Sequence, residues 1–141
     1  VASEVLSRAG EESDMIVGND EEFGFMAGGM NKGLDKARDL ASAGNRLVIY
    51  KMGEEGAITL YNNEEIKTGI FPTEAIKPVG AGDSFMAGLL SSLASGYDLK
   101  NSVIRGSACA SIVVSLPGCA PAMPDEDQLN NFINNSLIKD L

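Results

Sequence analysis

One short segment, KPVGAGDSF at residues 77–85, joins a glycine-rich turn, a carboxylate and the start of an apolar helix. The first turn of a helix has unpaired backbone N–H groups and carries the positive end of the helix dipole. Glycines at such a point let the backbone approach an anion closely, so the segment predicts a cradle for a phosphoryl group. Asp83 stands at the same helix entrance, where its carboxylate can accept a proton from a substrate hydroxyl. The residues alone leave a second interpretation open, in which Gly82 and Asp83 form only a turn and an N-cap.

Helical and strand patterns alternate along the first half of the chain. The expected elements are a helix end at 2–10, a buried strand at 14–17, an acidic helix start at 20–22, a helix at 34–43 that Gly44 ends, and a strand at 46–51 buried on both faces. This order of strand, helix and strand predicts a parallel crossover unit and therefore an α/β fold.

From residue 56 the pattern changes to shorter strands and then to helices. The expected elements are strands at 57–61 and 66–71, helices at 85–96 and 99–114, and a last amphipathic helix that Asp125 starts. Asn62-Asn63 is a favourable turn dipeptide, which predicts a hairpin between the two strands. Pro72 and Pro78 bracket an irregular connection. The apolar stripe of the 99–114 helix is expected to be core rather than a cofactor site.

The composition excludes several classes of partner and chemistry. Eleven basic residues against 20 acidic ones give a net charge of −9, which argues against a nucleic-acid or anionic-membrane partner. No apolar run approaches the roughly 18 residues that a membrane span needs, and the first residues show no signal pattern, so a cytoplasmic protein is expected. Cys109 and Cys119 are the only two cysteines, and the chain has no histidine, so neither a disulfide framework, a zinc site nor a histidine-activated nucleophile is predicted.

Four segments in order resemble the ribokinase-like (PfkB) sugar kinases. They are VGNDEEF at 17–23, YKMGEEGA at 50–57, GAGDSFMAGLL at 80–90 and SIVVSLPGCAPAMP at 111–124. The resemblance implies an ATP-dependent kinase with the family's three-layer α/β fold, and its wording is most similar to members that act on a sugar acid of inositol catabolism. Residues 1–141 would form the C-terminal part of that fold. The N-terminal part, with the sugar-binding residues and a small lid, would lie outside this chain.

The resemblance also implies roles for the residues of the glycine motif. Asp83 would be the catalytic base that deprotonates the sugar hydroxyl attacking the γ-phosphate of ATP. The backbone amides of Gly80, Ala81 and Gly82 would form the anion hole. Asn19 and Glu22, at the end of a predicted strand, would organise Mg²⁺ through water, since oxygen ligands suit this ion. The residues alone favour a different role for this pair, in which Asn19 caps the next helix and Glu22 completes a capping box.

Further residues are expected near the nucleotide. The resemblance implies that Asn19, Lys51, Gly53, Glu54, Gly56 and Ser107 contact ATP, and that the loop at 118–124 closes over the base. Gly53 and Gly56 are equally compatible with plain turns. No Gly-x4-Gly-Lys-Ser/Thr sequence occurs, so phosphoryl transfer would not use a Walker A loop.

The sequence departs from the family pattern just before the glycine motif. Many members have Asp-Thr there and use the Asp in a monovalent-cation site, whereas this chain has Lys77, Pro78 and Val79. The change argues against activation by potassium, and it places a positive charge where the cation would act. Ser107 likewise stands where many members have an Asn that faces the nucleotide.

Two alternative functions remain open. The first is another sugar kinase of the same family, acting on a different small sugar or sugar acid. The second is a nucleotide-binding fragment without activity, because the sugar-binding part lies outside the chain. Such a fragment would expose a sheet edge, which predicts self-association into a homo-oligomer.

Overall fold

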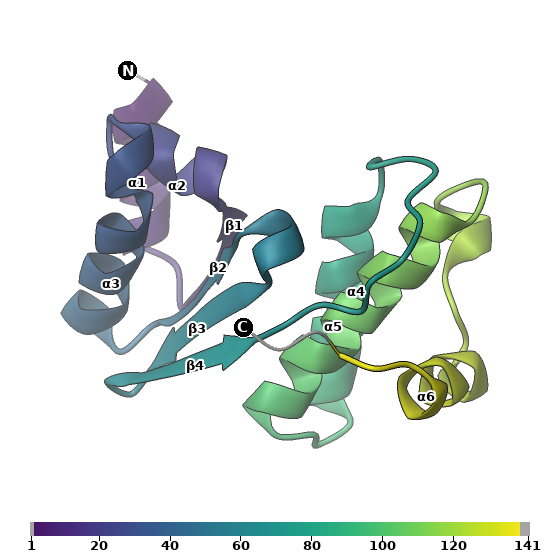
Figure 1. Ribbon diagram of the computed structural model, residues 1–141. Helices are drawn as coiled ribbons and strands as arrows, with labels where there is room; N and C mark the ends of the chain where they lie inside the picture. Colours follow the sequence, from purple (N-terminus) through teal and green to yellow (C-terminus); the bar gives the residue numbers. More distant parts are fainter. Residues whose placement is uncertain (1, 139–141) are drawn as a thin grey trace. The chain divides into compact units, whose positions relative to one another are not determined.

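The computed structural model describes residues 2–138, which form two compact units with the boundary between residues 67 and 68 (Figure 1). The first unit contains the sheet, and the second consists mainly of helices. Each unit has a hydrophobic cluster of its own. Among residues 2–138, no helix is both long enough and apolar enough to cross a membrane.

The first unit is built on a four-stranded sheet with strand order β1-β2-β3-β4. Its elements are α1 (Ala2–Glu11), β1 (Met15–Asn19), α2 (Asp20–Met26), η1 (Met30–Lys32), α3 (Gly33–Gly44), β2 (Leu47–Lys51), η2 (Gly53–Glu55), β3 (Ala57–Tyr61) and β4 (Glu64–Thr68). β1 and β2 pair in parallel, with α2 and α3 in the connection between them. The predicted parallel crossover unit is confirmed.

The β3–β4 hairpin of the first unit forms where it was predicted, but its second strand begins earlier than expected. Asn62 and Asn63 adopt φ values of 52° and 62°, as a two-residue hairpin turn requires, so the predicted hairpin is confirmed. Its second strand was predicted two residues too late, because β4 is Glu64–Thr68 rather than 66–71. The segment between β2 and β3 is also a hairpin connection, because these strands pair antiparallel.

Two further expectations need correction. The strand at 14–17 was expected to be buried, but Met15, Ile16 and Val17 are only half-buried, because β1 lies at one edge of the described sheet. Gly44 was expected to end the helix before β2. Instead Gly44 is its last helical residue, and Asn45 takes the left-handed conformation at φ 52°. Asparagine tolerates that conformation better than other side chains do.

The core of the first unit lies between α2, α3 and the sheet. Its buried residues are Phe23, Ala37, Leu40, Val48, Tyr50, Ile58 and Leu60. The rings of Phe23 and Tyr50 pack with their centroids 5.4 Å apart. Burial raises the pKa of the Tyr50 hydroxyl, and the charge of Asp20 adds to the effect, so Tyr50 stays neutral over the physiological pH range.

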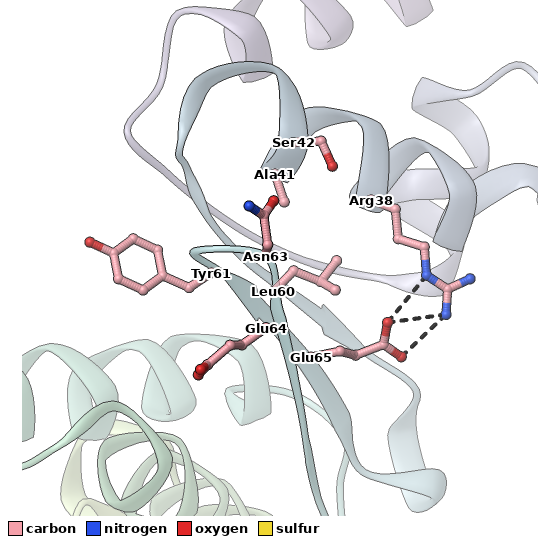
Figure 2. A pocket seen from close by; sticks show the side chains of 8 residues that line it. All are labelled: Arg38, Ala41, Ser42, Leu60, Tyr61, Asn63, Glu64 and Glu65. Atoms are coloured by element: carbon pink, nitrogen blue, oxygen red, sulfur yellow. Dashed lines mark hydrogen bonds and ion pairs between the residues drawn. The ribbon is translucent and has the colours of Figure 1, made fainter.

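A shallow hollow of about 230 Å³ lies between α3 and the β3–β4 hairpin of the first unit (Figure 2). Arg38 binds both carboxylate oxygens of Glu65 at 3.2 Å along its rim. The other lining residues are Ala41, Ser42, Leu60, Tyr61, Asn63 and Glu64. None of the predicted site residues lines this hollow.

The second unit packs two long helices and a shorter one. They are α4 (Ala81–Ala94), α5 (Leu99–Ser115) and α6 (Glu126–Asn135), with η3 (Ala120–Ala122) before the last. α4 and α5 approach closely at two glycines. A Cβ on Gly88 would lie 3.0 Å from the carbonyl oxygen of Arg105, and one on Gly106 would lie 2.8 Å from that of Phe85. Glycine at both positions is therefore a packing requirement.

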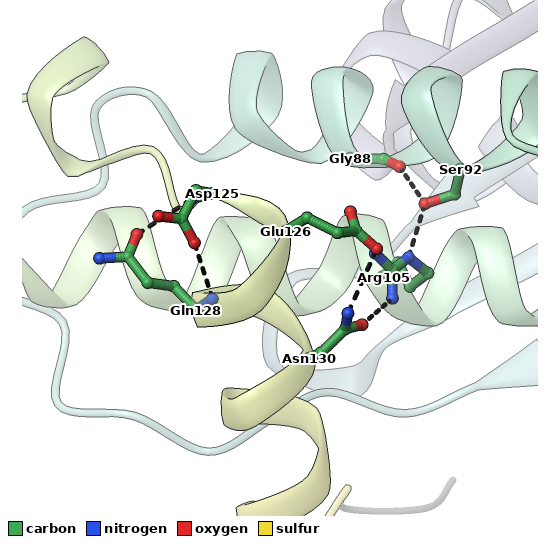
Figure 3. Close-up of polar contacts among 7 residues, drawn as sticks. All are labelled: Gly88, Ser92, Arg105, Asp125, Glu126, Gln128 and Asn130. Carbon is green, nitrogen blue, oxygen red and sulfur yellow. Dashed lines mark hydrogen bonds and ion pairs between the residues drawn. The ribbon is translucent and has the colours of Figure 1, made fainter.

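The apolar stripe of α5 is confirmed as core. Phe71, Ala108, Cys109 and Leu129 form a buried cluster, and Ile104 and Ile112 pack against it. Arg105 also lies on α5 and is only 5% exposed. It binds side chains of α4 and α6: Ser92 Oγ at 2.9 Å, Asn130 Oδ1 at 2.8 Å and Glu126 Oε1 at 2.6 Å (Figure 3). The guanidinium carbon also lies 4.4 Å from the ring centre of Tyr97.

Candidate active site

The glycine motif forms an uncapped helix N-terminus in the second unit. Gly80 is the N-cap residue of α4, adopts φ 91°, and no side chain caps the helix there. By contrast, the side chains of Asn19, Asp98 and Asp125 cap α2, α5 and α6. Asp83 lies in the first turn of α4 and is exposed. Its interpretation as a simple N-cap is therefore wrong, because α4 already begins at Ala81, before Asp83.

The backbone around the turn determines which amides face outward. The N–H of Ala81 donates to the carbonyl of Pro78 at 3.3 Å, and that of Ser84 donates to the carbonyl of Gly80 at 3.0 Å. The amides of Gly82 and Asp83 lie between them in the first turn, where no earlier helical carbonyl is available. Of the predicted anion-hole amides, that of Gly82 is therefore the best placed, together with that of Asp83.

Three side chains hold this turn in place, and no contact was predicted for two of them, Ser84 and Cys119. The Ser84 hydroxyl is buried and donates to the carbonyl of Gly80 at 2.6 Å. Cys119 Sγ donates to the carbonyl of Val79 at 3.6 Å. Lys77 Nζ donates to the carbonyls of Val79 at 3.2 Å and Val113 at 2.8 Å. Of these contacts, only the one from Ser84 is indicated by local sequence, because a serine hydroxyl in a helix commonly donates to the carbonyl one turn earlier.

Gly80 is required both for its backbone conformation and for space. A Cβ at this position would lie 3.0 Å from Cys119 Sγ, at a φ value that L side chains rarely adopt. Gly80→Ala should lower the free energy of unfolding by about 1–3 kcal/mol and turnover by about tenfold, because the displaced turn moves the first-turn amides. Urea unfolding and steady-state kinetics measure the two effects.

Gly96→Ala is the matched control for this substitution. Gly96 has φ 86° at the other end of α4, and nothing lies within 4 Å of the position that a Cβ would take there. Gly96→Ala should lower the free energy of unfolding by about 1–2 kcal/mol through backbone strain and leave turnover unchanged. Equal losses of turnover in the two variants would contradict a specific role of the Gly80 turn.

Asn19 and Glu22 form a reciprocal capping box in the first unit. Asn19 Oδ1 accepts the backbone N–H of Glu22 at 2.8 Å, and Glu22 Oε2 accepts that of Asn19 at 2.7 Å. This is the structural role that the residues alone favoured. Glu22 is nevertheless exposed and Asn19 half-buried. Their role toward Mg²⁺ stays a prediction.

The sheet brings Lys51 beside Asn19. These residues are partners in the parallel register at the carboxyl ends of β2 and β1, and open α/β sheets bind ligands at this edge. Gly53 and Gly56 follow in a tight turn with φ values of 57° and 86°, and Met52 N–H donates to the carbonyl of Gly56 at 2.8 Å. Glu54 is exposed in the same turn. The turn role of both glycines is confirmed, and contact with ATP stays a prediction.

The remaining candidates lie on α5 and the loop after it. Ser107 is 9% exposed in the middle of α5, which leaves little of its surface for a ligand in the second unit as described. The expected loop at 118–124 contains η3, and Gly118 has φ 80°. Burial raises the pKa of the Cys109 thiol to about 11, so this thiol stays protonated at neutral pH. Within residues 2–138, no group of three or more His, Cys, Asp or Glu residues is placed to hold a metal ion.

Comparison with known proteins identifies the family. The profile of the pfkB family carbohydrate kinases matches residues 2–126. A 5-dehydro-2-deoxygluconokinase of Photobacterium profundum is 39% identical over 126 residues, which are 86% of this chain and 38% of that protein. The chain spans 38% to 40% of the length of the curated relatives that it matches.

Solved structures share the fold. Ribokinase from Thermotoga maritima matches with a TM-score of 0.81 at 24% identity, over 92% of this chain and 45% of that one. Aminoimidazole riboside kinase from Salmonella enterica, complexed with aminoimidazole riboside and an ATP analog, matches with a TM-score of 0.82 at 24% identity, over 95% of this chain and 46% of that one. These matches confirm the expected ribokinase-like α/β fold. Because the family profile covers most of its residues, the chain belongs to the pfkB family of carbohydrate kinases.

Proposed function

We propose that the chain is the C-terminal part of a kinase that transfers the γ-phosphate of ATP to a primary hydroxyl of a sugar acid, 5-dehydro-2-deoxygluconate. The observation that carries this proposal is the uncapped start of α4, where Gly80 adopts φ 91° and Asp83 is exposed in the first turn. The relative named 5-dehydro-2-deoxygluconokinase, at 39% identity, supports this choice of substrate. The reaction would belong to inositol catabolism in the cytoplasm, where ATP is available.

The proposed mechanism uses Asp83 as the general base. The sugar oxygen forms a bond to the γ-phosphorus while the bond from that phosphorus to the leaving oxygen of ADP breaks, and the hydroxyl proton moves to the Asp83 carboxylate. The amides of Gly82 and Asp83, with the positive end of the α4 dipole, stabilise the charge on the transferring phosphoryl oxygens. This arrangement needs no cationic side chain at the phosphate.

The first unit would supply the nucleotide and magnesium contacts. Asn19 and Glu22 would hold Mg²⁺ through water, since side-chain oxygens suit this ion and neither residue is fully buried. Mg²⁺, when bound, neutralises charge on the phosphates. Lys51 and the turn with Gly53, Glu54 and Gly56 would lie along the nucleotide.

A kinase assay on the full-length protein tests the proposal. ATP is offered with 5-dehydro-2-deoxygluconate, ribose, fructose or 2-keto-3-deoxygluconate, while ADP release and the mass of the product are measured. The highest kcat/KM is expected with 5-dehydro-2-deoxygluconate. A higher value with one of the other sugars would replace the substrate but keep the kinase. No ADP release with any sugar would contradict the kinase itself.

The length of the chain favours a second possibility for residues 1–141 alone. Because they span 38% of the named relative, they would bind ATP without phosphorylating a sugar if the rest of the site lies elsewhere. Calorimetry with ATP, followed by the same kinase assay, distinguishes this fragment from an active enzyme. Analytical ultracentrifugation would report self-association through the edge of β1, whose outer side has no partner strand in the described sheet.

A further inference from the structure

We infer that the ammonium group of Lys77 is a tethered cation that holds the phosphate-binding turn, so that phosphoryl transfer does not depend on a free monovalent cation. This inference rests on the proposed function. It starts from two contacts: Lys77 Nζ donates to the carbonyl oxygen of Val113 at 2.8 Å and to that of Val79 at 3.2 Å. One charge therefore joins two backbone segments that are far apart in sequence.

The two carbonyls belong to the elements that define the turn. Val79 directly precedes Gly80, the N-cap of α4, whereas Val113 lies in the last turn of α5. The last carbonyls of a helix carry the negative end of its dipole, and a cation beside them is stabilising. The backbone adds to this connection, because the N–H groups of Ile76 and Lys77 donate to the carbonyl of Val114 at 2.9 and 3.3 Å. Lys77 thus holds the backbone segment that leads into Gly80 against the end of α5.

The two contacts of the Lys77 ammonium group are to the kind of oxygen that also binds monovalent cations. Backbone carbonyl oxygens are ligands that bind potassium in proteins, and here two such oxygens accept hydrogen bonds from a covalently attached ammonium group. Lys77 stands where the family resemblance implies an Asp in a cation site. A free cation beside the ammonium would be repelled by it. The residues therefore do not fit a bound potassium ion, and Lys77 is a positioning residue rather than a catalytic one.

The test compares variants of the full-length protein in potassium, ammonium and choline chloride at equal ionic strength. The wild type should turn over at the same rate in all three salts. Lys77→Ala should lose about tenfold or more in choline, since it removes two charge-assisted hydrogen bonds, and ammonium or potassium should restore part of the loss. Lys77→Asp, which adds a carboxylate to the two carbonyls, should become active only with potassium. Lys100→Ala removes an exposed charge from α5 and should behave like the wild type.

Thermal unfolding supplies a readout that needs no sugar substrate. Potassium should raise the Tm of Lys77→Asp relative to choline and leave that of the wild type unchanged, because only a state that binds the ion gains stability from it. Severalfold activation of the wild type by potassium, or full turnover of Lys77→Ala in choline, would overturn the inference. If the wild type phosphorylates no sugar, the proposed function fails, and the Tm comparison still decides whether Lys77 replaces the ion. If Lys77→Ala does not fold, the wild type and Lys77→Asp decide it.

Discussion

Asp83→Asn is expected to lower the turnover of the full-length kinase by about 10²–10⁴-fold, the usual contribution of a positioned general base. Asparagine has nearly the same shape as aspartate but cannot accept the hydroxyl proton as a base. Asp83 is exposed, so the fold should remain, with a loss of about 0.3–1 kcal/mol from the weaker interaction with the helix dipole. Steady-state kinetics with ATP and 5-dehydro-2-deoxygluconate measures the change.

Comparing kcat with the affinity for ATP distinguishes a catalytic base from a residue that only binds the nucleotide. If Asp83 acts as the base, kcat falls while calorimetric affinity for ATP stays within a few fold. Asp127→Asn is the matched control, because Asp127 is also an exposed carboxylate in the first turn of a helix, α6. Its turnover should equal that of the wild type. Near-normal turnover of Asp83→Asn would remove the proposed base.

Arg105→Ala is expected to lower the free energy of unfolding by about 2–4 kcal/mol. The substitution removes hydrogen bonds from one cationic group to three side chains, and it opens a cavity where the guanidinium packs against Tyr97. Glu126 is 60% exposed at its side chain and can be hydrated after the change, which keeps the loss below that of a fully buried pair. Urea unfolding measures the change.

Arg38→Ala is the matched control for this prediction. Arg38 also binds a glutamate, Glu65, but its side chain is 45% exposed, so the loss should stay below about 1 kcal/mol. Arg105→Lys should fall between the two, because lysine keeps the charge and cannot reach three partners with one planar group. A loss in Arg105→Ala no larger than that in Arg38→Ala would show that the network adds nothing to stability.

Several structural features followed directly from local sequence. Asn62-Asn63 predicted the hairpin turn because few residues tolerate the left-handed conformation, and alternating strand and helix patterns predicted the parallel pairing of β1 with β2. The ends of the elements were predicted less accurately than their types. Helix α4 begins at Ala81, four residues before its first large apolar residue, Phe85. The apolar pattern marks where a helix packs rather than where its hydrogen bonds begin.

The sequence by itself determined the type of the main helices and strands and the position of the glycine turn, because backbone preferences and apolar periodicity act over a few neighbouring residues. Four ordered motifs indicated the family. Only the tertiary structure decided what holds that turn. Lys77 meets Val113, and Cys119 lies against Gly80, although these partners are separated by 36 and 39 positions. Their contacts depend on the packing of α4 against α5, which no local pattern encodes.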